Sequence, residues 1–271
     1  MEYPDDEACL RKIFLDRYGK TPTCPRCNKP SKFYLVKGRK CFACAFCGRQ
    51  LHPLANTIFH KSSTSLKDWF YAIYLFSVSK NGVSAKEIER HVGVTYKTAH
   101  RMCRQIRKLM GEDDVLCGDV EVDETYIGGR HKRSDRYSKK SAVFGVVERK
   151  GRVSAKHVKS TGSRALIPEI RRRICDGANI HSDEHHAYKV LNKLGYNHQT
   201  VCHSCKEYVR GDVYTNTIEG FWSQLKRSIN GTFHHVSPKY LQLYVDEFCF
   251  RYNMRNKETN EVFRVLISKI Q

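Results

Sequence analysis

The sequence has 271 residues and a strong excess of positive charge, with 48 Lys and Arg residues against 28 Asp and Glu residues and a formal net charge of +20. A charge of this size usually indicates an anionic partner, most often nucleic acid. The sequence has no lipidation motif, no apolar secretory segment and no run near the ~18 apolar residues of a membrane span. We therefore expect a cytoplasmic protein that does not bind membranes.

The first predicted element is a zinc ribbon, in the stretch CPRCNKPSKFYLVKGRKCFACAFCGR that begins at residue 24. Two CxxC knuckles stand 16 residues apart, a spacing typical of a four-thiolate structural zinc site, and the apolar FYLV between them suits a short β-hairpin. The predicted ligands of one Zn²⁺ are Cys24, Cys27, Cys44 and Cys47. Cys41 falls outside the pattern and is predicted to be a free thiol. The alternative is four buried cysteines without a metal.

The other cysteines carry a weaker signal. In a chain with twelve cysteines and no secretory segment, a reducing compartment is expected, where thiols bind metal or are buried rather than form disulfides. Cys202 and Cys205 form a lone CxxC motif, for which we predict no metal. Residues 1–52 are assigned to an N-terminal segment with the zinc ribbon.

Two helices are predicted next. Ser65 can cap the run LKDWFYAIYLFSVSK, and Asn81-Gly82 closes it. Ser84 with Glu87 three residues later forms a capping box, which predicts a short helix to about His91.

A tight turn around Gly93 follows, and Thr95 can cap a longer helix to about Met110. Two helices joined by a glycine turn are the outline of a helix-turn-helix. Near the start of the second helix, where base contacts are usually made, the exposed side chains are predicted to be Tyr96, Lys97, His100, Arg101 and Arg104. The alternative is an ordinary helical hairpin with a solvated basic face. We assign residues 53–110 to a helical helix-turn-helix DNA-binding region.

The pattern changes at residues 111–114, GEDD, where we place a domain boundary. Alternating or β-branched residues predict strands in VLCGDVEVDETYIGG, SAVFGVVERKG and RVSAKHVKS, and later in ANIHSD and HQTVCHS. Helices are predicted in RALIPEIRRRI, TNTIEGFWSQLKR and SPKYLQLYVDEFCFRYN. Strands followed by alternation with helices predict a layered domain built on a mixed sheet, residues 111–271.

The first of these strands is acidic. Alternation places Asp119, Glu121 and Asp123 on one face, with Val120, Val122 and Glu124 on the other. Several acids on one strand face are costly unless they are solvated or neutralised, and a cation is the obvious remedy. Asp183 closes the strand ANIHSD, where a strand end can present an acid into a crevice.

The helix TNTIEGFWSQLKR, residues 215–227, has two distinct faces. At helical spacing the apolar side gathers Ile218, Phe221, Trp222, Leu225 and Ile229, and the polar side gathers Asn216, Glu219, Ser223 and Lys226. The apolar stripe predicts a core contact. The polar stripe is either a solvated face or one wall of a site.

Three carboxylates, Asp123, Asp183 and Glu219, could bind two Mg²⁺ ions, because Mg²⁺ prefers oxygen ligands. Such a pair could activate a water or a 3′-hydroxyl for attack on a phosphodiester. Acids at the ends of strands and helices are also common without any site, so the residues alone leave this hypothesis open.

Four stretches resemble the signature blocks of a known family. They are VEVDETYIGG, HSDEHHAY, HSCKEYVRGDVYTNTIEGFWSQLKR and GTFHHVSPKYLQLYVDEFCFRYN. In them the chain is similar to bacterial insertion-sequence transposases of the DDE class with an N-terminal zinc ribbon, the ISXO2-like group, to which the Merlin elements are related. The resemblance runs over nearly the whole chain and includes the ribbon.

The resemblance implies an α/β fold: an RNase H-like mixed-sheet catalytic domain preceded by a zinc ribbon and a helix-turn-helix. Its catalytic carboxylates lie on the first strand, at the end of the fourth strand and on a late helix, and Asp123, Asp183 and Glu219 match these places. Between the last two lie 35 residues, the separation described as DD35E. Lys226 matches the basic residue of the family.

Some assignments stay open. Related groups carry Asn in place of the third acid, so Asn216, one turn before Glu219, is an alternative, although the spacing favours Glu219. His203 and Arg210 lie in the HSCKEYVRG segment, which either contacts DNA or orders the site.

The resemblance implies a DNA transposase that binds the terminal inverted repeats of its element, cleaves DNA and transfers the 3′ ends to target DNA with two Mg²⁺ ions. It implies a homodimer or larger synaptic complex on double-stranded DNA, associated with the bacterial nucleoid when bound. One alternative is a non-catalytic zinc-ribbon DNA-binding protein, such as a domesticated transposase. Another is an RNase H-like nuclease without strand transfer.

Overall fold

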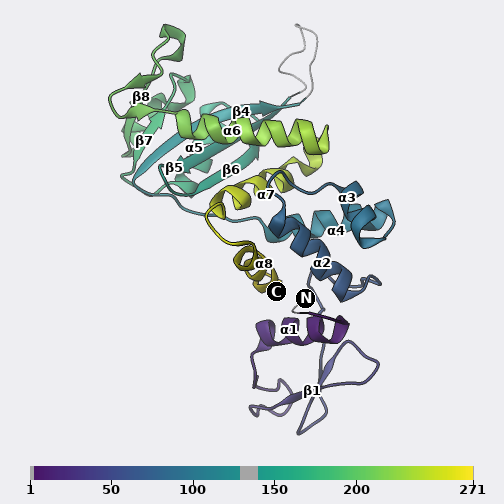
Figure 1. The fold of residues 1–271 in the computed structure, drawn as a ribbon. Coiled ribbons are helices and arrows are strands. Elements are labelled where there is room, and N and C mark those ends of the chain that lie inside the picture. Colours follow the sequence, from purple (N-terminus) through teal and green to yellow (C-terminus); the bar gives the residue numbers. More distant parts are fainter. Residues whose placement is uncertain (1–2, 129–139, 271) are drawn as a thin grey trace. The chain divides into compact units, whose positions relative to one another are not determined.

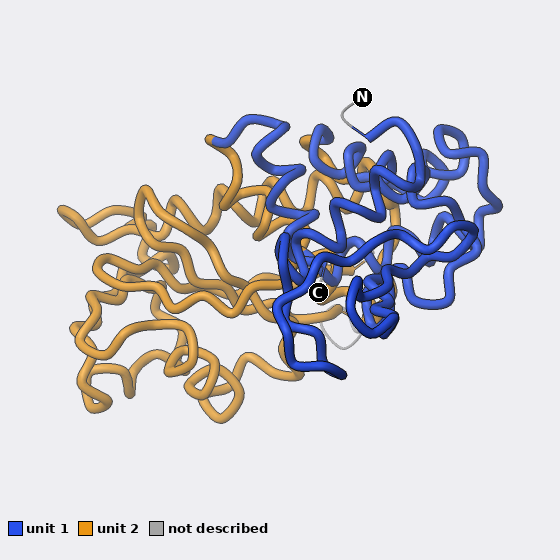
Figure 2. Tube along the Cα trace, turned by 90° about the horizontal axis from the view of Figure 1, so that it is seen from below, with its two compact units in different colours: residues 1–79, 83–109, 257–271 blue, residues 80–82, 110–256 orange. Residues whose placement is uncertain are grey.

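The structure is a computed structural model of the chain, and it describes residues 3–128 and 140–270. The described residues form two compact units (Figure 2). The first unit contains the chain up to Ser79, Val83–Leu109 and the segment from Lys257, and the second contains Lys80–Gly82 and Met110–Asn256. Within these described ranges, no helix is long and apolar enough to cross a membrane.

Helices and one small sheet build the first unit (Figure 1). The helices are α1 (Asp6–Tyr18), α2 (Leu66–Val78), α3 (Ala85–Val92), α4 (Tyr96–Leu109) and α8 (Thr259–Ser268). The antiparallel strands are β1 (Phe33–Leu35), β2 (Phe42–Cys44) and β3 (Gln50–Leu51). Strands β1 and β2 pair as the hairpin predicted between the two cysteine knuckles. The ribbon core is small, and Phe14 of α1 packs its ring against Phe42 at 4.3 Å.

The helix ends in this unit follow the predicted capping residues. The side-chain oxygens of Ser65 and Ser84 accept hydrogen bonds from the third amide that follows each of them. Gly93 ends α3 with a φ of 77°, a left-handed conformation that glycine adopts without steric cost. The two helices around a glycine turn are therefore present. Their identity as a DNA-binding helix-turn-helix stays a prediction.

A five-stranded mixed sheet forms the centre of the second unit. Its order is β6-β5-β4-β7-β8, from β4 (Asp119–Ile127), β5 (Ser141–Glu148), β6 (Val153–Val158), β7 (Asn179–Ser182) and β8 (Asn197–Thr200). Strands β4, β5 and β6 are antiparallel neighbours, while β7 runs parallel to β4 and β8 runs parallel to β7. The end of the first predicted strand, Gly129, lies outside the described residues.

Helices cover both faces of this sheet (Figure 1). They are α5 (Ser163–Arg173), α6 (Asn216–Ser228) and α7 (Leu241–Asn253). Shorter elements are η2 (His186–Val190), η3 (Asn192–Leu194), η4 (His203–Cys205), η5 (Ile229–Phe233), η6 (Pro238–Tyr240), β9 (Val209–Arg210) and β10 (Val213–Tyr214). The predicted α/β class with a mixed sheet is thus confirmed.

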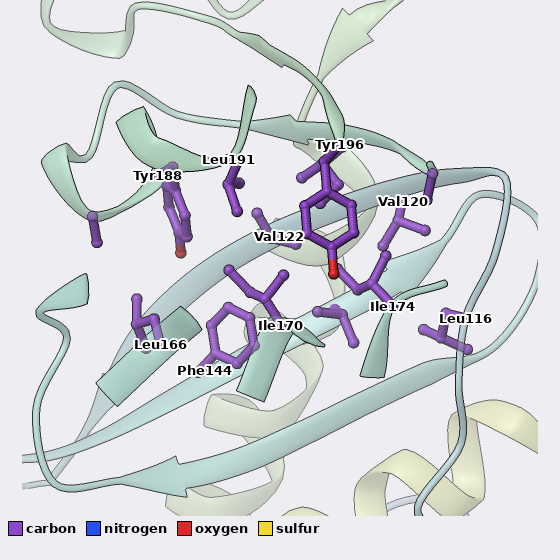
Figure 3. Packing of buried hydrophobic residues seen from close by; sticks show 14 of the residues in the cluster. Leu116, Val120, Val122, Phe144, Leu166, Ile170, Ile174, Tyr188, Leu191 and Tyr196 are labelled. Atoms are coloured by element: carbon purple, nitrogen blue, oxygen red, sulfur yellow. The ribbon is translucent and has the colours of Figure 1, made fainter. Parts of the chain in front are cut away.

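The sheet separates two apolar cores. On one face, Val120, Val122 and Phe144 pack with α5 and with Tyr188 of η2 (Figure 3). On the other face, Val143 and Val147 pack with the apolar stripes of α6 and α7. Since β5 is covered on both sides, it reads as a continuous apolar run instead of alternating.

One expectation about the cysteines is wrong. Cys117 and Cys175 form a disulfide, with their Cα atoms 5.1 Å apart, although the sequence predicted thiols that bind metal or stay buried and reduced. The neighbouring residues Leu116 and Ile174 form a parallel β-bridge, which brings the two cysteines together. The pair is separated by 58 residues, so no sequence spacing could show it.

The three-domain division made from the sequence stays a prediction. It assigned the segment from Lys257 to residues 111–271, whereas in the structure this segment groups with the first unit. The reason is apolar contact, because α8 buries Val262, Leu266 and Ile267 and packs against α2.

Candidate active site

The register of the central strands brings two of the predicted carboxylates together. On β4, Glu121 pairs with His181 of the parallel strand β7. Continuing this register by two residues sets Asp183, which directly follows the last residue of β7, beside Asp123. Adjacent parallel strands present their carboxyl ends at one edge of a sheet, so both acids lie at that edge.

The surroundings of Asp123 disfavour the charged form of its carboxyl group. Burial raises the pKa of Asp123 to about 8, and the neighbouring carboxylates of Glu124 and Asp183 act in the same direction. The indole Nε1 of Trp222 on α6 donates a hydrogen bond to Asp123 Oδ2 at 3.0 Å. Two carboxylates this close favour a proton or a cation between them. An oxygen-only donor set of this kind fits Mg²⁺.

Glu124 faces the opposite side of β4, as alternation predicts. The Tyr188 hydroxyl donates a hydrogen bond to its carboxylate, and His185 Nε2 lies 3.3 Å from Glu124 Oε1. Asp183 Oδ1 accepts a hydrogen bond from the backbone N–H of His185 at 3.0 Å. His185 therefore connects the two acids.

Glu121 is fully buried and neutralised, but by groups of the protein instead of the cation suggested from the sequence. Its Oε2 accepts hydrogen bonds from the backbone N–H groups of Thr217 and Ile218 at 2.9 and 3.0 Å. Arg149 Nε donates to its Oε1 at 3.0 Å. A helix N-terminus carries partial positive charge, so the first turn of α6 together with Arg149 neutralises Glu121.

Glu219 projects from α6, which lies along the sheet next to β4 (Figure 1). Its side chain is 47% exposed, Thr215 Oγ1 donates to its Oε1 at 2.9 Å, and His203 Nε2 lies 3.8 Å away. In the described part of the chain, Asp123, Asp183 and Glu219 do not form a group whose ligand atoms all lie within 4.8 Å. The structure thus brings the carboxylates of Asp123 and Asp183 together, while that of Glu219 is hydrogen-bonded to Thr215.

Two other predicted residues lie on the same helix. Lys226 is exposed overall, but part of its side chain is buried, which lowers the pKa of its amino group. The Asp123 carboxylate opposes that shift. Lys226 is therefore close enough to Asp123 for their charges to interact. Asn216 is the exposed first residue of α6.

The segment before α6 is attached to the site by Glu184. Its carboxylate accepts hydrogen bonds from the backbone N–H groups of His203 and Ser204 at 2.8 and 2.9 Å. Backbone N–H groups, its own and that of Ser204 foremost, lower the pKa of Glu184 to about 2. Arg210 donates a hydrogen bond to the carbonyl of Thr200. His203 of this segment lies 3.8 Å from Glu219, and whether the segment contacts DNA or orders the site stays a prediction.

The four predicted zinc ligands form one cluster. The sulfur atoms of Cys24, Cys27, Cys44 and Cys47 all lie within 4.8 Å of one another. Although desolvation acts against it, the hydrogen bond with Ser31 and those from backbone N–H groups lower the pKa of Cys44 to about 6. Although the N–H of Arg49 acts against it, desolvation and the other thiols raise the pKa of Cys47 to about 11. Four thiolates at this separation need a cation, and Zn²⁺ fits the donor set. Cys41 is free, as predicted.

The predicted DNA-contacting residues of α4 differ in exposure. Tyr96 and Lys97 are exposed, while His100, Arg101 and Arg104 are half-buried. Arg101 Nη2 donates to the carbonyl of His60 at 3.3 Å. The helix therefore presents its first turn most openly.

Comparison with known proteins decides the family. Residues 115–253, which contain all three carboxylates, match the ISXO2-like transposase domain, and residues 4–50 match the transposase zinc-ribbon domain. The chain belongs to the ISXO2-like transposase family. It is 27% identical over 268 residues to an uncharacterized protein in transposable element ISH50 of Halobacterium salinarum, with 90% of each chain covered.

Two further similarities are more limited. An uncharacterized transposase-like protein of Haemophilus influenzae is 27% identical over 109 residues, which cover 40% of this transposase-family chain and 85% of that protein. A chain of the simian T-cell lymphotropic virus intasome in complex with PP2A regulatory subunit B56 gamma shows 16% identity, 64% coverage of each chain and a TM-score of 0.32. So low a TM-score supports no argument about the fold.

Sequence reasoning missed several residues of this site. Trp222 was interpreted only as core, because its spacing matches the apolar stripe, and nothing in a sequence shows where an indole N–H points. Glu124 and His185 were not singled out. Their position within the stretches DET and DEHH, next to the two predicted acids, was the available signal.

Proposed function

We propose that this ISXO2-like family member is an active DNA transposase in which Asp123, Asp183 and Glu219 bind the catalytic metal ions. The observation that carries the proposal is the pair Asp123 and Asp183 on neighbouring parallel strands, with the pKa of Asp123 raised by burial and by the adjacent acids. Two neighbouring acids, one of them with its charge disfavoured by burial, destabilise a fold, so a function for their charge accounts for their presence.

Two Mg²⁺ ions, when bound, would supply the Lewis acidity that activates a water or 3′-hydroxyl and stabilises the leaving oxygen. Asp123 and Asp183 provide carboxylate oxygens at the sheet edge. Glu219 provides a third, exposed carboxylate that leaves its bond to Thr215 to join them. Lys226 places a positive charge near Asp123, where it can attract a phosphate of the substrate.

The DNA substrate is double-stranded, with the terminal inverted repeats of the element and a target duplex as the two partners. The zinc ribbon and the α3–α4 pair would recognise the repeats, with Tyr96 and Lys97 at the open end of α4 and Arg101 and Arg104 behind them. Cleavage of two ends requires a homodimer or larger synaptic complex, and a cytoplasmic, nucleoid-associated protein has access to them.

The test uses the zinc-loaded full chain and a labelled duplex that carries the element's end, with Mg²⁺ and a target plasmid. Wild-type protein should give nicked ends and joined products, and Asp183→Asn should give neither. Asp176→Asn is the matched control, since this exposed acid precedes β7 at the opposite end of the strand. Nicks without joined products would indicate a nuclease, and binding without nicks would indicate a non-catalytic DNA-binding protein.

A further inference from the structure

Trp222 makes a contact that its place in the apolar stripe of α6 does not require. Its ring is 3% exposed and packs in the core between the sheet, α6 and α7. Its Nε1 nevertheless donates to Oδ2 of Asp123 at 3.0 Å. A phenylalanine ring could fill much of the same space, so packing alone does not account for the N–H.

Gly145 provides the space for this contact. It pairs with Asp123 across β4 and β5. A Cβ atom on Gly145 would lie 2.5 Å from Cη2 of Trp222 and 3.2 Å from Cδ1 of Ile218, both closer than ordinary van der Waals contact. Gly145 does not have a positive φ, so its backbone conformation does not demand glycine. Only a residue without a side chain lets the indole lie directly on the strand opposite Asp123.

Glu121 fixes the position of α6 along β4. The first-turn amides of Thr217 and Ile218 donate to its buried carboxylate. Arg149 holds the chain that enters this turn, because it donates to the carbonyls of Asp212 and Tyr214 at 2.7 and 3.0 Å. The helix is thus attached to β4 two residues before Asp123, and this attachment sets the position of the Trp222 ring along the strand.

We propose that Trp222 is a positioning residue for Asp123: it holds Oδ2 and so keeps the carboxylate in the orientation that binds the catalytic cation. This inference rests on the proposed function, because it concerns the same carboxylate. Residues that hydrogen-bond a metal-binding side chain orient it and tune its affinity, and their loss typically weakens metal binding about 10- to 100-fold.

Trp222→Phe removes the N–H and keeps an aromatic ring in the core. We expect Mn²⁺, used as the probe cation, to bind the zinc-loaded, DNA-free chain about 10- to 100-fold more weakly in calorimetry. Half-maximal cleavage should need correspondingly more Mn²⁺, with the maximal rate largely restored by excess metal. A purely structural role would lower stability and leave the Mn²⁺ affinity of the folded chain unchanged.

The matched control is Trp69→Phe. Trp69 is the other of the two tryptophans, lies on α2 in the first unit, and donates its Nε1 to Ser62 Oγ at 3.0 Å. It has an equally buried ring and a comparable hydrogen bond, whose acceptor is a hydroxyl instead of a carboxylate. Its replacement should leave Mn²⁺ affinity within about twofold of wild type, since its N–H holds no predicted ligand.

The control chain also gives a direct readout, because Trp222 is its only indole. Mn²⁺ is paramagnetic and quenches a nearby indole, so the fluorescence of Trp69→Phe should fall as Mn²⁺ saturates the site. The added substitution Asp123→Asn should abolish this quenching. This measurement needs no change at Trp222 and therefore stands even where Trp222→Phe does not fold.

The outcomes separate the two proposals. Unchanged Mn²⁺ affinity in folded Trp222→Phe, or Mn²⁺ binding to Trp69→Phe without quenching, overturns the positioning role. Weaker binding and Asp123-dependent quenching support it. If these are found in a chain that neither nicks nor joins DNA, the proposed transposase function fails while the positioning role stands.

Discussion

The zinc ribbon and the carboxylate site hold their charged ligands in opposite ways. The ribbon's four sulfur atoms lie within 4.8 Å of one another, held by two short knuckles and a small apolar contact around Phe14. The carboxylates come from three distant points of the chain: two lie at the edge of a sheet with an apolar core on each face, and the third lies on α6. Asp123 and Asp183 are adjacent, while Glu219 is bonded to Thr215.

The difference shows how far each site depends on its cation. In the ribbon, local turns gather the ligands, but so small a unit buries little apolar surface, so folding and metal binding are coupled. In the second unit the fold is stabilised by its cores, and under the proposed assignment only the third carboxylate has to move. Loss of metal should therefore unfold the ribbon and leave the sheet intact.

The largest effect is expected when a carboxylate of the sheet is neutralised. Asp123→Asn or Asp183→Asn should lower DNA cleavage by about a thousandfold or more, since metal ions supply several kcal/mol of transition-state stabilisation and each 1.4 kcal/mol is tenfold in rate. Binding to the element's end should stay within about twofold, because the ribbon and α4 are untouched. Nicking and gel-shift assays on the same duplex measure both; a parallel loss of binding would show that these acids hold the fold.

In the ribbon, the loss of one ligand should instead weaken DNA binding. Cys44→Ser should abolish the single bound Zn²⁺ and weaken binding to the element's end about 10- to 100-fold, because a metal site that lacks one thiolate no longer folds the ribbon. Cys41→Ser is the control, since Cys41 is buried in the same ribbon but lies outside the cluster, with its thiol near Gln50. Zinc content and gel shifts measure the effect. A Cys44→Ser chain that retains zinc and full affinity would contradict the role of the cluster.

Glu121→Gln should destabilise the second unit by about 3 kcal/mol, because the half-buried Arg149 and the first turn of α6 lose the fully buried charge that satisfies them. Asp119→Asn, two residues earlier on the same strand face, should cost less than about 1 kcal/mol, since this carboxylate is 55% exposed. Urea denaturation at fixed zinc gives both values. Equal costs for the two changes would mean that Glu121 does not anchor α6.

A smaller effect is expected from pH. Burial lowers the pKa of His198 from 6.5 to about 4 in the folded protein, so between these values the unfolded chain binds the additional proton. Stability is therefore complete above pH 6.5 and is lost as the pH falls toward 4. The full shift corresponds to about 3 kcal/mol, which solvent screening of the partly exposed ring reduces to about 2 kcal/mol. His198→Gln, whose amide can keep the bond to Ser182 Oγ, should lose less stability between pH 7 and pH 5. The same loss in both proteins would exclude His198 as the source.

The two sites also differ in how well the sequence predicts them. The ribbon is recognisable from spacing, because its ligands are neighbours within each knuckle. The faces of β4 follow from alternation, which correctly separated Asp123 from Glu124. What neutralises Glu121 could not be predicted, because Arg149, Thr217 and Ile218 reach it only through the packing of the sheet against α6.

The contacts of single side chains could not be predicted from the sequence either. Trp222 satisfies the apolar pattern of its helix. Its hydrogen bond to Asp123 depends on Gly145, whose lack of a side chain leaves room for the indole. The disulfide between Cys117 and Cys175 depends on a β-bridge between residues far apart in the chain. Periodicity predicts which face a residue occupies, and only the assembled fold decides what lies opposite it.

The central claim is that Glu219, on the polar face of α6, completes the carboxylate site. The most direct measurement is Mg²⁺-dependent nicking of an end-containing duplex by Glu219→Gln and by Asn216→Ala, with a gel shift on the same DNA. Glu219→Gln keeps the side chain's size and removes the charge, so cleavage should fall by orders of magnitude with binding intact. Asn216→Ala should be much milder, because a neutral amide cannot neutralise a cation. Normal cleavage by Glu219→Gln together with an inactive Asn216→Ala would contradict the assignment and make Asn216 the third ligand.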